Sequence, residues 1–483
     1  MKVPQDFECR ARKWLGEERY GCLEAAFQEE PSVSVRLNPA KVKGLDLPAG
    51  GEVPWAAAEG RYLKDRPMFT ADPWFHAGAY YVQEASSMSL GMAVRRYVDF
   101  PVVALDLCAA PGGKSTHLRA LLPEGSLLVS NEPVRARAQV LAENMTKWGH
   151  PDVVVTQSYP ADFSRLTGFF DVVVADVPCS GEGMFRKEAD AVAGWSMDCV
   201  AMCRDRQRDI LRAVWPALRP GGLLMYSTCT FNPYENEENV DWIARELGAE
   251  LLPLAVDEAW HVCGDLRGDA GCAGPLLPVC HFLPGLVRGE GFFLSVLRKT
   301  STNAGDCGAE SAVGMPARLR KREKGKSGEG GGADPAFRSW LRHPLAFDFR
   351  DCGPRVVAFR AAWSRRLDLL CRAAKVIHAG IPLAERKGKD WMPLHALALS
   401  AEVAPSAFPV AEVDYDTAVA YLRKEALVLP PAVPKGYALV AYGGLPLGFV
   451  KNVGGRANNL YPAEWKIRTG HLVPYSLRDS SFL

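Results

Sequence analysis

Between residues 100 and 300, short apolar runs alternate with longer segments whose apolar residues recur at helical spacing. One apolar run, at 102–107, ends in a glycine-rich loop at 108–113, and a helix is predicted at 115–122. Later strands are predicted at 127–130, 153–156, 171–176, 223–227, 251–256 and 292–297, and helices at 135–148, 200–218 and 235–247. Because strands separated by helices pair in parallel, the pattern predicts a doubly wound α/β sheet that binds its ligand at the carboxyl ends of the strands.

The first 100 residues predict a small α+β domain that precedes this sheet. A strand is expected at 32–37, an irregular stretch at 50–73 and the start of a helix within 80–88. Aromatic residues gather near the end of this region, at Trp74, Phe75, Tyr80 and Tyr81. Stacking on nucleic-acid bases is one interpretation, but we favour packing of this domain on the next, because aromatic rings contribute strongly to such interfaces.

Composition changes sharply at 301–334, which is rich in Gly, Ser and Ala and carries the basic run RLRKREKGK at 318–326. We interpret this stretch as a flexible basic linker, with contact to RNA phosphates as the alternative. Residues 335–483 predict another domain, in which apolar runs at 437–442 and 447–451 flank two glycines and indicate a β-hairpin. Cations lie in and after the hairpin, at Lys451, Arg456, Lys466 and Arg468. They fit a nucleic-acid surface and a merely solvated face equally well.

The composition of the 483-residue chain limits its partners. A net charge of +1 means that any nucleic-acid surface is a local patch and not a property of the whole molecule. The 13 cysteines are scattered and odd in number, which favours free thiols in a reducing compartment over a disulfide framework. The N-terminus lacks the apolar core of a signal peptide, and no apolar run reaches the about 18 residues of a membrane span. We therefore expect a cytoplasmic monomer without a membrane partner.

The glycine-rich loop predicts a nucleoside site. Gly112 and Gly113 have no Cβ, so a ligand can approach the backbone closely. The sequence GKS at 113–115 matches the end of a phosphate-binding GxxxxGK[ST] loop, but Cys108 stands where that motif needs its first glycine. Glu132 comes 19 positions after Gly113, where dinucleotide-binding folds place an acid that binds the ribose hydroxyls. A surface carboxylate is the less favoured interpretation of Glu132, and together these features indicate an adenosine-type cofactor.

Two cysteines follow neighbouring strands of the predicted sheet. Cys179 comes after the strand at 171–176, and Cys229 comes after the strand at 223–227. Because neighbouring strands lie about 5 Å apart, both thiols should face one crevice beside the cofactor loop. We therefore assign this pair a chemical role. Other cysteines fit small buried hydrophobes: Cys22, Cys199, Cys203 and Cys371.

A zinc site is the alternative interpretation for another group of residues, which comprises His261, Cys263, Cys272, Cys280 and His281. Their spacing lacks the paired CxxC knuckles that structural zinc sites use. Zinc is therefore the less favoured interpretation, and no metal is predicted.

Three motifs, in this order, resemble the RNA 5-methylcytosine methyltransferases that use S-adenosylmethionine. They are LDLCAAPGGKS at 105–115, ADVPCSGEGMFRK at 175–187 and YSTCTFNPYENEENV at 226–240. Further segments are similar to the ribosomal subfamily with a C-terminal PUA-like RNA-binding module, at 80–88, 281–293, 378–399 and 451–468. The resemblance implies a Rossmann-like methyltransferase domain at 101–300, between an N-terminal domain at 1–100 and a PUA-like domain within 335–483. It also implies that the substrate is a cytosine in the 16S RNA of the small ribosomal subunit.

The resemblance further implies a role for individual residues. Cys229 is the nucleophile that bonds to the base, Cys179 assists product release, and Asp176 lies between the cofactor and the base. Glu132 holds the ribose of S-adenosylmethionine. The remaining cofactor contacts fall on the loop residues Cys108, Ala109, Ala110, Pro111, Gly112, Gly113 and Lys114.

One position departs from the family pattern. The family usually reads the adenine of the cofactor with an acidic residue just after the third strand. This chain has Tyr159 at the corresponding place, and Asp162 is the candidate substitute in the same loop. The adenine contact is therefore left open.

Three alternatives are kept beside this interpretation. A tRNA cytosine methyltransferase would use the same chemistry on another RNA. A DNA cytosine methyltransferase would use Cys179 as its nucleophile and would not need Cys229. A non-catalytic RNA-binding assembly factor would keep the fold but not the thiols, so the presence of both cysteines favours an enzyme that acts on RNA.

Overall fold

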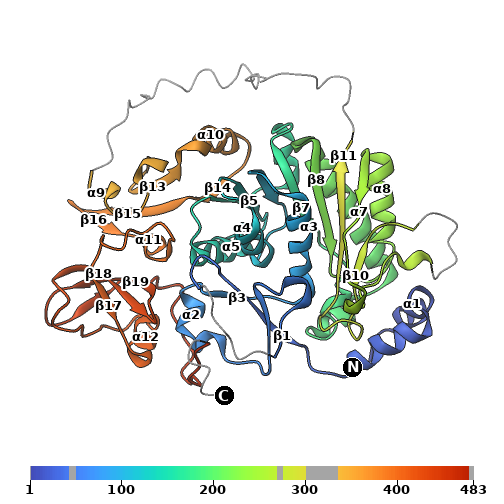
Figure 1. Ribbon diagram of the computed structural model, residues 1–483, viewed down its shortest axis with the longest axis horizontal. Coiled ribbons are helices and arrows are strands. Elements are labelled where there is room, and N and C mark those ends of the chain that lie inside the picture. The colour runs from blue at the N-terminus through green and yellow to red at the C-terminus, as the bar shows by residue number, and fades with distance from the viewer. Residues whose placement is uncertain (1, 43–49, 269–275, 301–334, 478–483) are drawn as a thin grey trace.

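The computed structural model describes residues 2–42, 50–268, 276–300 and 335–477. The expected basic linker at 301–334 lies outside the described residues. In Figure 1 a central sheet with its helices lies between the N-terminal helix α1 (Gln5–Ala26) on one side and the C-terminal strands on the other. No helix in these ranges is both long and apolar enough to cross a membrane.

The central sheet contains all the strands that the alternation predicted. Its order is β10-β11-β8-β7-β4-β5-β6-β14, and β9 pairs with β11. The strands up to residue 300 are β4 (Val103–Asp106), β5 (Leu127–Asn131), β6 (Val153–Thr156), β7 (Phe170–Asp176), β8 (Leu218–Thr228), β9 (Ala249–Leu252), β10 (Cys280–Phe282) and β11 (Phe292–Lys299). Strands β4 to β8 pair in parallel, as predicted, whereas β11 runs antiparallel to β8. The carboxyl ends of the parallel strands therefore meet at one edge of the sheet.

Alternate residues of the buried strands face two separate apolar layers. Ala104 of β4 packs with residues of α3, α4 and α5, whereas Val103 and Leu105 pack with residues of α7 and α8. The helices are α3 (Leu90–Tyr97), α4 (Gly113–Leu121), α5 (Arg135–Trp148), α6 (Ala189–Gly194), α7 (Met197–Val214) and α8 (Glu237–Glu246). Because successive strand side chains point to opposite faces, a strand covered on both faces must be apolar at every position. This is why continuous apolar runs predicted these strands.

The N-terminal region contains a three-stranded sheet, which corrects two expectations. Its order is β2-β1-β3, with β1 at Val33–Leu37, β2 at Gly60–Leu63 and β3 at Tyr80–Val82. The prediction of irregular structure over 50–73 is wrong for β2, and the helix expected from residue 80 begins later, because β3 occupies its start. Both short strands pair with β1, where Val35 lies opposite Arg61 and Val82. Long-range pairing thus decides their conformation. Short helical segments complete the region: η1 (Pro54–Ala56), η2 (Phe69–Ala71), α2 (Pro73–His76) and η3 (Ser86–Ser89).

The aromatic residues near 74–81 are packing residues. Trp74 and Tyr80 are 5% and 2% exposed, so neither ring can stack on a nucleic-acid base. They share an apolar cluster with Tyr421 and Leu422 of the C-terminal helix α12 (Tyr415–Leu422). The prediction of packing on the next domain holds for Tyr81, whose Cε1 lies 3.3 Å from the position of a Cβ on Gly113, whereas Trp74 and Tyr80 pack on the C-terminal region.

Residues 335–400 place one strand in the central sheet. Strand β14 (Val376–Ala379) pairs antiparallel with β6 at the edge of the sheet. The neighbouring sheet has the order β12-β13-β15-β16. The elements of this segment are α9 (Pro335–Arg338), η10 (Pro344–Ala346), β12 (Phe347–Cys352), β13 (Arg355–Arg360), α10 (Ser364–Ala373), β15 (Ile381–Lys387), β16 (Asp390–Pro393) and α11 (His395–Leu399). A segment that follows the core in sequence is therefore part of the core in space.

The last sheet contains the predicted hairpin. Its order is β17-β18-β19-β20, with β17 at Val410–Glu412, β18 at Gly436–Tyr442, β19 at Leu445–Asn452 and β20 at Ala457–Asn459. Strands β18 and β19 pair antiparallel around the two glycines at 443 and 444, so the hairpin prediction is confirmed. Beside this sheet, a groove of about 600 Å³ is lined by Arg423, Lys466 and Arg468. Two of the four predicted basic residues therefore lie in one groove.

Candidate active site

The glycine-rich loop at 108–113 leads from β4 into α4, and we call it the cradle loop. Gly112 directly precedes α4 and has a φ of +118°, and a Cβ there would lie 3.3 Å from the Cδ1 of Leu141. The Nδ2 of Asn144 donates to the carbonyl of Pro111 at 2.8 Å and holds the loop against α5. The positive φ favours glycine at this position, and a Cβ there would press against Leu141 and Asn144 of α5.

Asp106, the last residue of β4, is a site residue that the sequence analysis missed. Its side chain is fully buried, and its Oδ2 accepts a hydrogen bond from Ser115 Oγ at 2.6 Å. Its Oδ1 has no hydrogen-bond partner among the described residues. Burial raises the pKa of Asp106 to about 7. A buried, unpartnered carboxylate oxygen beside the cradle fits a ligand that brings a hydrogen-bond donor. In the sequence, the signal that could have identified Asp106 is an acidic residue at the end of an apolar strand.

Glu132 lies at the same edge, directly after β5, and is 2% exposed. One carboxylate oxygen accepts the backbone N–H of Val134 at 3.0 Å, and the other pairs with Arg137 at 3.3 Å. The Nη2 of Arg137 also lies 3.3 Å from the carbonyl of Ala110 in the cradle loop. The interpretation of Glu132 as a surface carboxylate is therefore wrong, because its carboxylate is anchored beside the loop.

The loop after β6 is joined to the C-terminal part of the chain. Lys375, just before β14, donates its backbone N–H to Ser158 Oγ at 2.9 Å and accepts from the backbone N–H of Gln157 at 2.8 Å. Tyr159 is 72% exposed, and its backbone N–H donates to Asp162 Oδ2 at 3.0 Å. Asp162 therefore caps the short helix η4 (Pro160–Arg165) through this bond.

The two predicted thiols meet. Cys179 Sγ and Cys229 Sγ lie 3.1 Å apart, past the paired ends of β7 and β8, so the prediction that neighbouring strand ends bring the two thiols to one place is confirmed. The neighbouring Cys229 thiol, and then burial, raise the pKa of Cys179 well above its ordinary value. The backbone N–H of Gly183 donates to the Cys229 carbonyl at 2.7 Å, and a Cβ on Gly183 would lie 2.6 Å from that oxygen. The thiol loops are thus packed backbone against backbone.

Asp176 connects the cradle loop to the thiol loops. Its Oδ2 accepts from Lys114 Nζ at 2.8 Å, and its Oδ1 accepts from Ser227 Oγ at 2.8 Å. Burial lowers the pKa of Lys114, but the pairing with Asp176 outweighs it and the net shift is upward. Lys114 therefore carries its charge, and 28% of the Asp176 side chain is still exposed.

A buried polar network, formed by Glu182, Asn232 and Glu235, locks the two thiol loops together. The Nδ2 of Asn232 lies 2.9 Å from an oxygen of Glu182 and 2.9 Å from an oxygen of Glu235, and it also lies 2.7 Å from Thr230 Oγ1. Glu182 also accepts the backbone N–H of Phe231 at 2.6 Å, and Glu235 accepts that of Ser180 at 3.0 Å. The sequence analysis missed this network, because nothing in the local pattern distinguishes a buried acid from a solvated one.

Replacing Glu235 with glutamine should flatten the dependence of stability on pH. Burial, and then the charge of Glu182, raise the pKa of Glu235 to about 7 from an ordinary value of 4.5. Between these values the folded protein holds a proton that the unfolded chain has released, so wild-type stability falls as pH rises. The loss is at most about 3 kcal/mol across this window. Urea unfolding at pH 5 and pH 7.5 measures it.

The exposed Glu246→Gln variant at the end of α8 is the matched control and should retain the wild-type pH slope. An identical slope in wild type and Glu235→Gln would mean that Glu235 is ionised throughout this range.

The remaining cysteines and histidines have other surroundings. His281 on β10 bonds through Nε2 to Glu237 Oε1 at 2.8 Å, and Cys272 lies outside the described residues. Within the ranges that the structure describes, no three His, Cys, Asp or Glu side chains gather as a metal site would require. Cys203 is buried, as predicted, but Cys371 is exposed on α10, so its interpretation as a buried hydrophobe is wrong.

Three family models match successive parts of the chain. The model for 16S rRNA methyltransferase RsmB/F matches residues 101–298. The model for the N-terminal domain of 16S rRNA methyltransferase RsmF matches 3–85, and the methyltransferase RsmF PUA domain matches 408–467. A protein named ribosomal RNA small subunit methyltransferase F from Klebsiella pneumoniae (strain 342) is 30% identical over 470 residues, and its namesake from Escherichia coli (strain SE11) is 31% identical over 473. Each alignment covers 93% of both chains.

The chain belongs to the RsmB/F family of 16S rRNA methyltransferases. The resemblance inferred from the three motifs is therefore confirmed at the level of the family. A solved methyltransferase homologue from Pyrococcus horikoshii is 25% identical and has a TM-score of 0.51, covering 61% of this chain and 95% of its own. NSun6 from the same organism, solved with SFG, is 18% identical with a TM-score of 0.51, covers 62% of this chain and 98% of its own, and shows the shared fold. The predicted Rossmann-like fold with a C-terminal PUA domain is confirmed.

Proposed function

We propose that this RsmB/F-family enzyme methylates C5 of a cytosine in 16S rRNA in the cytoplasm, with S-adenosylmethionine as methyl donor and Cys229 as covalent nucleophile. The observation that carries the proposal is the thiol pair, with 3.1 Å between its sulfurs, next to the Asp176–Lys114 pair. Membership of the family supports methyl transfer to ribosomal RNA, and the PUA domain supports RNA binding. C5 of cytosine is a poor nucleophile until a thiolate adds to C6, and the thiol pair supplies that group.

The residues around the cradle fit S-adenosylmethionine. The unpartnered Oδ1 of Asp106 offers a buried acceptor, Glu132 presents an anchored carboxylate at the end of β5, and Gly112 turns the loop into α4 with a positive φ. When bound, this cofactor supplies an activated methyl group. The Lys114–Asp176 pair joins the first turn of α4 to the end of β7, the strand that leads to Cys179.

The two thiols have different roles: Cys229 adds to the base as a thiolate, and Cys179 first donates its S–H to that thiolate and later removes the C5 proton. Cys229 releases its proton to solvent, whereas Cys179 stays protonated because its pKa is raised. The S–H of Cys179 can then donate to Cys229 Sγ and stabilise the thiolate that adds to C6. Once Cys229 is bonded to carbon, it no longer raises the pKa of Cys179. Cys179 then ionises more readily, releases its proton to solvent and takes the proton from C5. The electron pair of that C–H bond re-forms the ring double bond and expels Cys229.

Asp176 is placed to hold the base during this addition. Its carboxylate can accept a hydrogen bond from the exocyclic N4 amino group of cytosine, and the charge of Lys114 lies behind it at 2.8 Å. Ser227 Oγ occupies the other carboxylate oxygen, so the side chain cannot rotate freely. Fixed polar groups of this kind stabilise charge that develops in the transition state at no reorganisation cost.

The proposal is tested by incubating purified enzyme with labelled S-adenosylmethionine and one of three substrates: 16S rRNA, assembled small subunits or tRNA. Bisulfite sequencing of the product identifies methylated cytosines. We expect one or a few protected cytosines in the 16S RNA and none in tRNA. Bisulfite protection found only in tRNA would mean that tRNA, and not 16S rRNA, is the substrate. Labelled RNA without bisulfite protection would contradict C5 of cytosine as the methyl acceptor.

Replacing Glu132 with alanine should weaken cofactor binding by about 1–3 kcal/mol, the usual value for hydrogen bonds to a charged group. The carboxylate is buried and anchored at the strand end, so no other side chain replaces its contacts with a ribose. Calorimetric titration with S-adenosylmethionine measures the loss. Arg137→Ala removes the ion-pair partner and leaves the carboxylate in place, so it is the matched control, with a smaller expected effect. Equal affinity of wild type and Glu132→Ala would remove Glu132 from the cofactor site.

A further inference from the structure

A cavity of about 1100 Å³ lies between the N-terminal sheet and the catalytic domain. Its walls are strand β1 and the preceding turn, the segment 63–66 after β2, the end of β3, residues 186–187 and the turn 285–289 before β11. This volume exceeds the about 300–1,000 Å³ of most small-molecule sites. No step of the proposed reaction uses it, so a further and larger ligand is indicated.

The cavity borders both halves of the active site. On one wall, Gln83 lies 3.8 Å from the position of a Cβ on Gly113 in the cradle loop. On the opposite wall, Arg186 pairs with Glu290 at 3.4 Å. The carbonyl of Glu290 lies 3.0 Å from the position of a Cβ on Gly183, whose N–H donates to the Cys229 carbonyl. The walls of the cavity are therefore formed by segments that pack against the cofactor loop on one side and against the thiol loops on the other.

Exposed cations line the cavity from three separate segments. Lys64 and Arg66 follow β2, Lys187 follows the thiol loop, and Arg288 belongs to the turn before β11. Arg288 is held in place because it donates to the carbonyl of Gly50 at 2.7 Å and stacks over the ring of Tyr62 at 4.1 Å.

Acidic residues also line the cavity, namely Glu29, Glu30, Asp65 and Glu84. The excess of positive charge in the cavity is therefore small. The carboxylate of Glu84 is occupied, since it accepts the backbone N–H groups of Ser86, Ser87 and Glu290 at 2.8–2.9 Å. The four exposed cations can therefore each contact a phosphate. The net charge of the cavity is too small to attract every polyanion strongly.

Apolar side chains stand between these charges. Val33, Val82 and Leu286 contribute apolar surface to the same walls. A cavity that combines separate cations with apolar surface matches an unpaired strand, whose phosphates and base faces are both accessible. A target base must also leave its helix before a thiol can reach C6, which requires an unpaired neighbourhood.

We propose that this cavity binds the single-stranded RNA segment directly adjacent to the target cytosine, with Lys64 and Arg66 on its phosphates. The inference rests on the proposed function, which supplies the RNA and the position of its reacting base. It adds the route by which the strand passes between the N-terminal sheet and the thiol loops.

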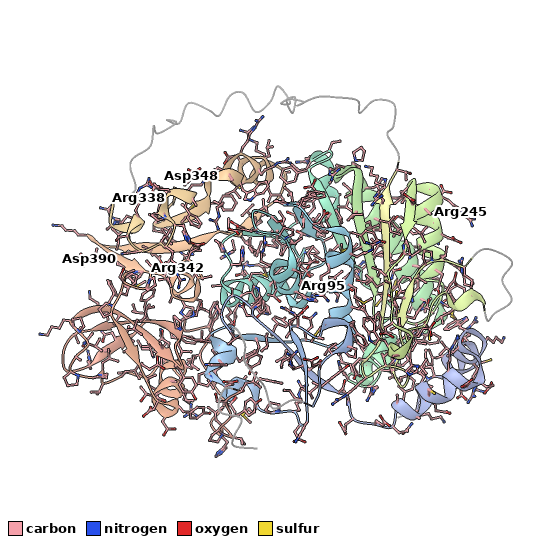
Figure 2. All side chains as sticks on the ribbon, viewed as in Figure 1. Arg95, Arg245, Arg338, Arg342, Asp348 and Asp390 are labelled. Carbon is pink, nitrogen blue, oxygen red and sulfur yellow. The ribbon has the colours of Figure 1, made fainter. Side chains whose placement is uncertain are left out.

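The first test is the salt dependence of binding to 16S rRNA. The variant Lys64→Ala/Arg66→Ala removes two exposed cations from the cavity, and Arg212→Ala/Arg245→Ala is the control with the same change in charge. Arg212 and Arg245 are 55% and 77% exposed on α7 and α8, and Arg245 lies at the outer edge of α8 in Figure 2. At about 0.7 per phosphate contact of a single strand, the slope of log Kd against log salt should fall by about 1.4 in the cavity variant. The control should keep the wild-type slope, and an unchanged slope in the cavity variant would overturn the proposal.

The second test fixes the register of the strand. RNA carrying 4-thiouridine beside the target cytosine is held by the Cys179→Ala enzyme, whose covalent adduct is expected to persist, and is then irradiated. Cross-linked peptides should contain residues 64–66 or 285–289. Cross-links of these neighbouring nucleotides to other surfaces would contradict the route. If no adduct forms, the proposed function fails, and the salt slope still decides whether the cavity binds RNA.

Discussion

Replacing Cys229 with alanine should abolish both methyl transfer and the covalent protein–RNA adduct. Without a thiolate at this position, C5 of cytosine is never activated, and loss of a nucleophile commonly lowers kcat by roughly 10⁴- to 10⁶-fold. Cys179 is not expected to take over, because its sulfur lies 3.1 Å from the attacking position and burial still raises its pKa when the Cys229 thiol is removed. Transfer of labelled methyl groups to 16S rRNA, and a denaturing gel for the adduct, measure the two losses.

The Cys179→Ala variant should behave in the opposite way. Cys229 can still add to C6 and the base can still be methylated, but the C5 proton is not removed, so the enzyme stalls on its product. A slow, RNase-sensitive band should therefore accumulate with Cys179→Ala and vanish in the double variant. Cys371→Ala, which removes an exposed thiol on α10, should match wild type in both assays. A trapped adduct with Cys229→Ala and none with Cys179→Ala would reverse the roles and indicate the DNA-type mechanism.

Replacing Asp176 with alanine should lower kcat by about 10²- to 10³-fold, the usual cost of removing one fixed group that stabilises a transition state. The change removes the contact proposed for the base and leaves the charge of Lys114 without its partner at 2.8 Å. Single-turnover methylation at saturating cofactor separates this chemical effect from weaker binding.

The matched control for this change is Asp171→Ala, at the opposite end of the same strand. Asp171 pairs with Arg219 at 2.6 Å and accepts the backbone N–H of Val103 at 2.7 Å. Its side chain is 25% exposed, against 28% for Asp176, so its loss tests the cost of removing a comparable ion-paired acid from β7. We expect reduced stability but near-normal turnover. If Asp176→Ala weakens only the affinity for S-adenosylmethionine, with unchanged turnover at saturation, then Asp176 serves the cofactor and not the base.

The sequence by itself determined the core fold and the thiol pair. Strands that are covered on both faces must be apolar throughout, and helices covered on one face must be periodic, so local pattern was enough to predict β6 and α5 with their observed bounds. The meeting of Cys179 and Cys229 also followed, because each comes directly after a strand and parallel strands end at one edge. The position of a residue just after a strand can therefore be predicted once the order of the strands in the sheet is known.

Tertiary structure alone decided the parts that depend on contacts between distant segments. Strand β2 forms because β1 offers it a partner, and β14 joins the central sheet more than 200 positions after β6. The acids Glu182 and Glu235 look like surface residues in the sequence, yet they are fully buried, because Asn232 and backbone N–H groups satisfy them. Local patterns record which residues prefer burial or a given backbone shape. They do not record which distant group will supply a hydrogen bond or a strand edge. The strands β2 and β14 and the buried acids depend on such distant groups, so only the tertiary structure decided them.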